Sequence, residues 1–143
     1  MTKTPIHLWI VGVLSLLWNA GGAVDYSMTK FKVAAYLEAL PEAGLRMLQE
    51  APIWFDASWA IGVWFSVLGS IFLLARSRLA AGAFALSFAG LVVSSIYTYG
   101  LSDGGSMMAT SGTAAIVFAI AIPVILILLW IYARAMTRKG VLR

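Results

Sequence analysis

The sequence has no cysteine and a single histidine, His7. The absence of cysteine excludes disulfides, thiolate metal sites and cysteine nucleophiles. One histidine excludes bis-histidine haem and multi-histidine metal centres. No Ser/His/Asp catalytic set can form around it, because it lies at the opposite end of its apolar run from the other polar residues. We therefore expect no metal, no cofactor and no enzymatic activity.

Charged side chains are also scarce. They make up 11% of the 143 residues, and hydrophobic residues make up 62%, with a mean hydropathy of +0.92. Soluble domains are about one quarter charged, so the chain belongs to the membrane class and is long enough for one domain, residues 1–143. The net charge of +4 does not indicate nucleic acid, because the basic residues flank apolar runs and serve to orient them. We expect contact with membrane lipids and not with nucleic acid.

Four apolar runs are each long enough to cross a hydrocarbon core about 30 Å thick. They cover residues 6–24, 53–75, 79–100 and 113–136. The first run also has features of a secretory signal peptide, with Lys3 before it and small residues at 21–23 as a candidate cleavage site. Trp18 and Asn19, just before that site, favour a retained span. The sequence predicts an all-α integral membrane protein, built as an antiparallel four-helix transmembrane bundle.

A polar segment, residues 27–51, separates the first two spans. Apolar residues alternate with charges over residues 30–40, and Pro41 followed by Glu42 is typical of a helix start. We expect two interfacial helices here, lying over the bundle on the extracytoplasmic side. Residues 101–105 have the Asp and Gly of a turn between the last two spans.

The charges are distributed unequally between the two sides of this four-span arrangement. One side carries seven basic residues, Lys3, Arg76, Arg78, Arg134, Arg138, Lys139 and Arg143. The other side carries three basic residues and all six acids, namely Lys30, Lys32, Arg46, Asp25, Glu38, Glu42, Glu50, Asp56 and Asp103. By the positive-inside rule, both termini of this multi-pass protein are expected to be cytoplasmic.

Small residues recur every three or four positions along the first three spans. They are Gly12, Ser15 and Gly22 in the first, Gly62, Ser66 and Gly69 in the second, and Ala83, Ser87 and Gly90 in the third. Membrane helices associate through close packing of small residues, because lipid provides no hydrophobic collapse. We expect these residues to face inward and to pack helix against helix.

Polar and aromatic residues gather in the half of the bundle predicted to lie outward. The candidate pocket residues are Asn19, Asp25, Tyr26, Asp56, Trp59, Tyr97 and Asp103. Each also has an ordinary structural interpretation. Asp25 would cap the helix after the first span, Asp56 would sit at a helix dipole and Asp103 would form a turn. Asn19 would hydrogen-bond across the bundle, and the rings would belong to an interfacial aromatic belt.

Short motifs are spread along nearly the whole chain, namely Trp18-Asn19, Gly22, Asp25-Tyr26, Met28-Thr29, Tyr36-Leu37, Pro52 with Trp54, Trp59 with Gly62-Val63-Trp64, Gly69-Ser70, Ala85-Leu86-Ser87, Tyr97 and Leu101-Ser102-Asp103-Gly104. Together they resemble those of a family of small uncharacterised bacterial inner-membrane proteins. The resemblance implies a four-span protein of the bacterial inner membrane. Some members carry the automatic label "sugar transporter", which no motif of this chain supports.

Three functions are compatible with these features. The first is a non-enzymatic accessory or scaffold protein, because the chain is small and has packing seams but no charge in mid-membrane. It would associate with another integral membrane protein or with a second copy of itself. The second is a small oligomeric transporter of a solute or cation through the outward pocket, although the chain has no carboxylate between Asn19 and the cytoplasmic face. The third is a lipid-binding protein with the interfacial helices as a lid.

Overall fold

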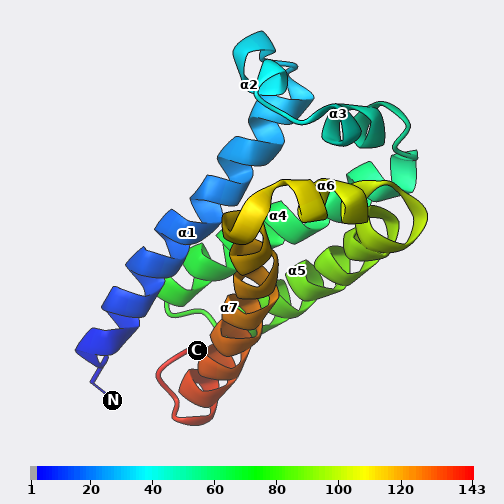
Figure 1. Cartoon of the computed structure of the whole chain (residues 1–143). Helices are drawn as coiled ribbons and strands as arrows, with labels where there is room; N and C mark the ends of the chain where they lie inside the picture. The colour runs from blue at the N-terminus through cyan, green and yellow to red at the C-terminus, as the bar shows by residue number, and fades with distance from the viewer. Residues whose placement is uncertain (1–2) are drawn as a thin grey trace.

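The computed structural model describes residues 3–143, apart from the side chains of Met107 and Thr110. Within that range the chain forms helices and loops and no strand. Four helical segments are long and apolar enough to cross a membrane (Figure 1). They are α1 (Ile6–Lys30), α4 (Ile53–Leu74), α5 (Leu79–Ser95) with its π-helical continuation η1 (Ile96–Leu101), and α7 (Gly112–Arg138). The predicted all-helical membrane fold with four spans is confirmed.

The first span continues beyond its predicted end at residue 24. Residues 24 and 25 offer no glycine or proline to stop the helix, so α1 runs on to Lys30, and its 25 residues cover about 37 Å. It ends where Lys32 takes a left-handed conformation (φ 51°) and Val33 N donates to Met28 O at 3.1 Å. Asp25 therefore lies inside α1, and its predicted role as a cap for the following helix is wrong.

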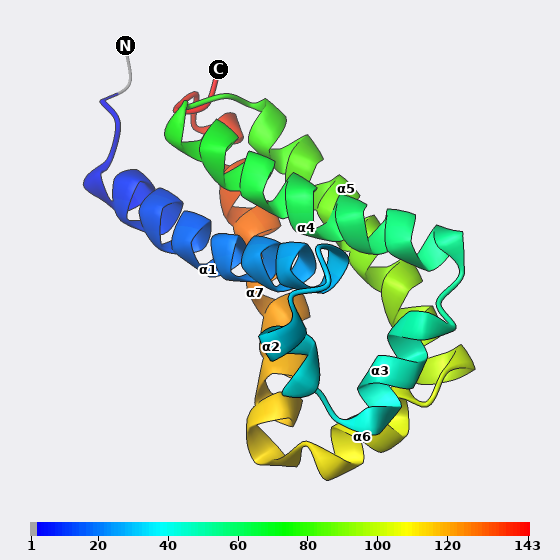
Figure 2. The ribbon, with the colours of Figure 1, turned by 90° about the horizontal axis from the view of Figure 1, so that it is seen from above.

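Three short helices lie outside the long ones. They are α2 (Ala34–Glu38), α3 (Glu42–Gln49) and α6 (Gly104–Thr110). Pro41 and Glu42 do mark the start of α3, as the sequence predicted. The turn predicted at residues 101–105 is confirmed at Ser102 and Asp103, after which α6 begins at Gly104 and packs against α3 (Figure 2).

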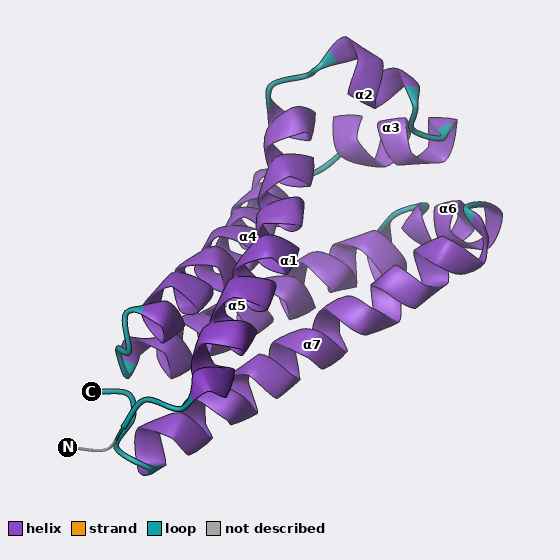
Figure 3. Cartoon of the chain, turned by 90° about the vertical axis from the view of Figure 1, so that its left-hand side faces the viewer, coloured by secondary structure: helices purple, strands orange, loops and turns teal. Residues whose placement is uncertain are grey.

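The long helices pack in the order α1, α4, α5, α7, each mainly against its neighbours in this series. The first and last helices lie close together near the two termini and diverge toward α6 (Figure 3). Near the termini, the His7 ring of α1 and the Tyr132 hydroxyl of α7 are hydrogen-bonded at 2.5 Å. The bundle is therefore closed at one end and open between α1 and α7 at the other.

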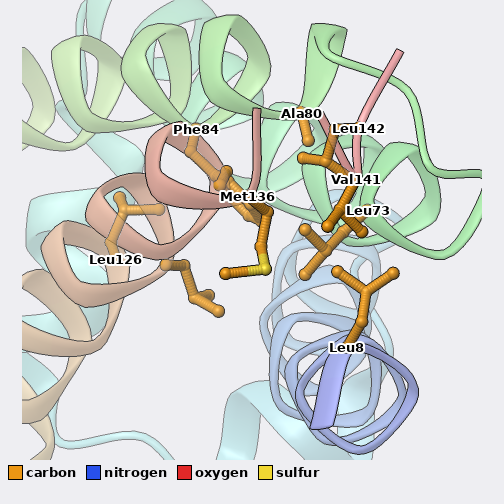
Figure 4. Close-up of a cluster of buried hydrophobic side chains, with 10 residues drawn as sticks. Leu8, Leu73, Ala80, Phe84, Leu126, Met136, Val141 and Leu142 are labelled. Carbon is orange, nitrogen blue, oxygen red and sulfur yellow. The ribbon is translucent and has the colours of Figure 1, made fainter. Parts of the chain in front are cut away.

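A buried apolar core fills the closed end (Figure 4). It contains Leu8, Leu73, Ala80, Phe84, Leu126, Leu129, Ala133, Met136, Val141 and Leu142. The last two belong to the C-terminal tail, which folds back onto the turn between α4 and α5. There Arg143 N donates to Arg76 O at 2.8 Å, and Arg78 N donates to Arg143 O at 3.0 Å. The Arg76 guanidinium also donates to Thr4 Oγ1 at 2.7 Å, so both chain ends are tied to one turn.

Most of the small residues named in the sequence lie where helices meet. A Cβ added at Gly90 would come within 2.6 Å of Gly62 N, so α4 and α5 cross backbone against backbone. A Cβ added at Gly69 would lie 2.6 Å from the Phe84 ring. A Cβ added at Gly12 would lie 2.5 Å from the Leu74 side chain. The other small residues predicted to face inward in the first three spans are all buried, namely Ser15, Ser66, Ala83 and Ser87. Gly22 differs, because a Cβ there would meet nothing within 4 Å. Its predicted role in helix packing is therefore wrong.

Candidate functional site: a cavity between the first and last spans

A cavity of about 780 Å³ occupies the open half of the bundle. Residues of α1, α2, α4, α5 and α7 line it. It owes its space to the divergence of α1 from α7 and to Gly21 and Gly22, which present no side chain on the α1 wall. Leu126 belongs both to the cavity wall and to the buried core, so the cavity lies directly on the core.

Asn19 is a buried polar residue of the cavity wall. Its Nδ2 donates to Ser66 O at 3.1 Å and to Ser70 Oγ at 2.9 Å, which ties α1 to α4. Within the described part of the chain, Asn19 Oδ1 accepts no hydrogen bond. Every fully buried side-chain oxygen there does have a partner, so Asn19 Oδ1 is not fully buried. Since Asn19 lines the cavity, this oxygen is open to it and can accept a hydrogen bond.

Three serines of the wall have already used their hydroxyl protons. Ser66 Oγ donates to Val63 O at 2.7 Å, Ser87 Oγ to Gly62 O at 2.5 Å and Ser94 Oγ to Leu91 O at 3.0 Å. Such bonds from serine to backbone are a common way to satisfy hydroxyls in membrane helices. What these serines can offer a ligand is therefore an acceptor oxygen.

At its outer part the cavity is bordered by Asp25 of α1 and Tyr36 of α2. The Tyr36 hydroxyl donates to Asp25 Oδ1, which holds α2 against α1. Burial, followed by this hydrogen bond and the negative charge of Asp25, raises the pKa of Tyr36 to about 12. The phenol therefore stays protonated and remains the donor at neutral pH.

The ion pairs of the described residues do not include Asp25. Lys30 lies 2.5 Å from Asp56, and Arg46 lies 3.5 Å from Glu42. Asp25 thus has an uncharged phenol as its partner and no basic side chain within 4.0 Å in the described chain.

Aromatic rings close the sides of the cavity. Trp18 of α1 and Phe118 of α7 are stacked, with centroids 5.8 Å apart and planes 16° from parallel. They bridge the gap between the diverging helices. Trp59 of α4 also lines the cavity, and the Tyr26 ring packs edge-on against it at 4.9 Å.

The structure brings together some of the predicted pocket residues and separates others. Asn19, Asp25 and Trp59 line one cavity, and Tyr26 supports Trp59. The other three predicted residues do not line it. Asp56 lies in the first turn of α4 and pairs with Lys30, Tyr97 is buried with its hydroxyl donating to Met47 O at 3.3 Å, and Asp103 is exposed just before α6.

The predicted pocket left out six polar or aromatic residues of the wall, Trp18, Tyr36, Ser66, Ser87, Ser94 and Phe118. Ser66 and Ser87 did carry a signal, because they belong to the small residues predicted to pack helix against helix. Part of that surface lines the cavity. Tyr36 and Phe118 carried none, because their positions depend on how α2 folds back and on where α7 diverges.

In the described residues no group of three or more His, Asp or Glu side chains is placed to hold a metal ion. Comparison with known proteins finds no matching family model, no matching curated protein and no matching solved structure. The resemblance to the four-span inner-membrane family therefore stays a prediction.

Proposed function

We propose that this multi-pass membrane protein binds an amphipathic small molecule of the lipid class in the cavity between α1 and α7. One observation carries the proposal: the cavity lies between two helices long and apolar enough to span a membrane, and it combines apolar walls with a few acceptor oxygens. Leu17, Leu91 and Ile122 supply apolar wall, and Asn19 and Asp25 supply polar ends. Ligand sites of this kind are mostly apolar, with a few polar groups that fix orientation.

We place the closed end in the cytoplasm and the cavity end outside. The basic residues Arg76, Arg78 and Arg143 meet at the closed end, and the positive-inside rule favours that orientation. Both termini would then be cytoplasmic and the spans antiparallel, with α2 and α3 at the outer interface of a bacterial inner membrane. Tyr36 of α2 would make that helix a lid over the cavity.

An accessory role beside another integral membrane protein, or beside a second copy, is the second candidate. The observation that favours it is the small buried share of the outer helices. The apolar window of α7 is 11% buried and that of α1 is 22% buried, against 33% for both inner spans. A partner helix would cover these faces.

The test uses two glycines that each face open space. Gly22→Leu fills the cavity, whereas Gly82→Leu adds the same side chain on α5 away from it, and neither added Cβ meets an atom within 4 Å. Each variant is purified from its native membrane in mild detergent, and retained molecules are identified by native mass spectrometry.

We expect wild type and Gly82→Leu to retain an amphipathic molecule and Gly22→Leu to lose it. Equal retention by Gly22→Leu would contradict binding in the cavity. A stoichiometric integral membrane protein in the preparation, with no small molecule retained, would favour the accessory role.

A further inference from the structure

The hydrogen-bonding groups of the cavity wall favour one kind of ligand charge. The amide donor of Asn19 and the hydroxyl donors of Ser66, Ser87 and Ser94 are bound to protein oxygens. Apart from the indole N–H groups of Trp18 and Trp59, which lie among the wall residues, the wall offers acceptor oxygens. A cationic or proton-donating group would therefore find more hydrogen-bonding partners there than an anionic group.

The formal charge of the wall points the same way. Asp25 contributes a carboxylate, and none of the described residues that line the cavity is basic. The nearest comparison is Asp56, on the neighbouring helix α4, whose charge is compensated by Lys30 at 2.5 Å. Asp25 shares its oxygen with the neutral Tyr36 hydroxyl, so its charge is still available to a ligand.

Rings surround the same space. Trp18, Trp59, Tyr36 and Phe118 all line the cavity, from four different helices. The faces of aromatic rings attract cations, and the attraction strengthens where water is excluded. Carboxylate, ring faces and apolar walls together match a molecule with one positive charge and a hydrophobic body.

We propose that the ligand is a hydrophobic cation, with its positive group between Asp25 and the ring faces and its apolar body along Leu17, Ile122 and Leu126. This inference rests on the proposed function, because it needs the cavity to be a binding site. It adds the sign of the charge and the residue that recognises it.

Tetraphenylphosphonium and tetraphenylborate provide the test, because they have nearly the same size and shape and opposite charge. Binding of each to the full chain in neutral-lipid nanodiscs is measured by equilibrium dialysis, with empty nanodiscs subtracted. The wild-type chain should prefer the phosphonium by about tenfold or more, since a carboxylate attracts one ion and repels the other.

Two variants remove the same charge in different places. Asp25→Asn keeps an oxygen that accepts from Tyr36 but should lose most of the preference. Asp56→Asn, which removes a carboxylate outside the cavity, should leave the preference unchanged. Asp25→Glu should restore it, which separates loss of charge from a folding defect.

The outcomes separate the two proposals. Equal binding of both ions, or a preference that survives Asp25→Asn, would overturn the cation proposal, and the cavity would remain a site for neutral amphipaths if Gly22→Leu still abolishes retention. Phosphonium binding that is unchanged in Gly22→Leu would place the cation site outside the cavity and overturn the cation proposal, and unchanged retention of the native molecule in the same variant would overturn the proposed function as well. Loss of phosphonium binding in both Gly22→Leu and Asp25→Asn would support both.

Discussion

The two ends of the bundle are built from the same kinds of residues and differ in what lies opposite them. At the closed end, Gly12 faces Leu74 and Gly69 faces Phe84, and each glycine is covered. At the cavity end, Gly21 and Gly22 face nothing within 4 Å. A small residue on a membrane helix therefore gives close packing only where the neighbouring helix supplies a matching group. Where the neighbour diverges, the same residue gives a cavity.

Polar groups differ between the ends in the same way. At the closed end, backbone groups and the Arg76 side chain are bonded to other parts of the chain, which fixes the termini. At the cavity end, Asn19 Oδ1 and Asp25 retain capacity to accept. One end is thus organised for stability, and the other has the acceptor groups that the proposed ligand would use. The following changes test that contrast, from the largest expected effect to the smallest.

A phenylalanine at each end gives the strongest contrast. Phe84→Ala should lower the free energy of unfolding by about 3–5 kcal/mol, because Phe84 is fully buried and its removal leaves a cavity in the core. Phe118→Ala, at a position 56% exposed, should lower it by only about 0.5–1.5 kcal/mol, through loss of the stack on Trp18. Unfolding in mixed detergent micelles, followed by circular dichroism, measures both. Similar losses for the two variants would remove the distinction between the ends.

Glycines allow a second comparison within α5. Gly90→Ala should destabilise by about 1–3 kcal/mol, because the new Cβ would meet Gly62 N and Ser58 O at 2.6 Å, and backbone yields poorly. Gly82→Ala meets open space, so it should stabilise the helix by about 0.5–1 kcal/mol through lower backbone entropy. The same unfolding assay gives both values. A neutral Gly90→Ala would mean that α4 and α5 can separate without cost.

Asn19 marks the border between the two ends, and a double-mutant cycle measures its bond across α1 and α4. Asn19→Ala and Ser70→Ala each remove one side of the 2.9 Å hydrogen bond. Their coupling energy should be about 0.6–1.7 kcal/mol, as for other hydrogen bonds between membrane helices. Additive effects, with no coupling, would mean that Asn19 faces the cavity and contributes to binding alone.

The four spans were predictable because length and hydropathy are local properties of the sequence. The packing of Gly12, Gly62, Gly69 and Gly90 also follows a local spacing. The cavity was predictable only in part. Asn19, Asp25 and Trp59 were found because polar or aromatic groups in the outer half of a span are conspicuous, whereas Asp56 has the same signal and turns to Lys30 instead.

Which partner a polar side chain such as Asp56 pairs with depends on contacts between segments far apart in the chain. The end of α1 illustrates it. Asp25 was expected to cap a helix, but α1 continues past it and α2 folds back so that Tyr36 meets it. No local pattern around residue 36 specifies that contact.

The Tyr36 contact gives the smallest expected effect and can be followed without unfolding the protein. The absorbance of tyrosinate near 295 nm is titrated in wild type and in Tyr36→Phe, and the difference isolates one phenol of five. Its midpoint should lie near pH 12 and not near 10, because burial and Asp25 disfavour the phenolate. A raised pKa means that Tyr36 adds stability below about pH 10, which is lost as the pH rises toward 12. Asp25→Asn should lower the midpoint but leave it above 10, since burial is the larger cause. A midpoint at 10 in the wild type would mean that α2 is not held on α1 and that the cavity has no lid.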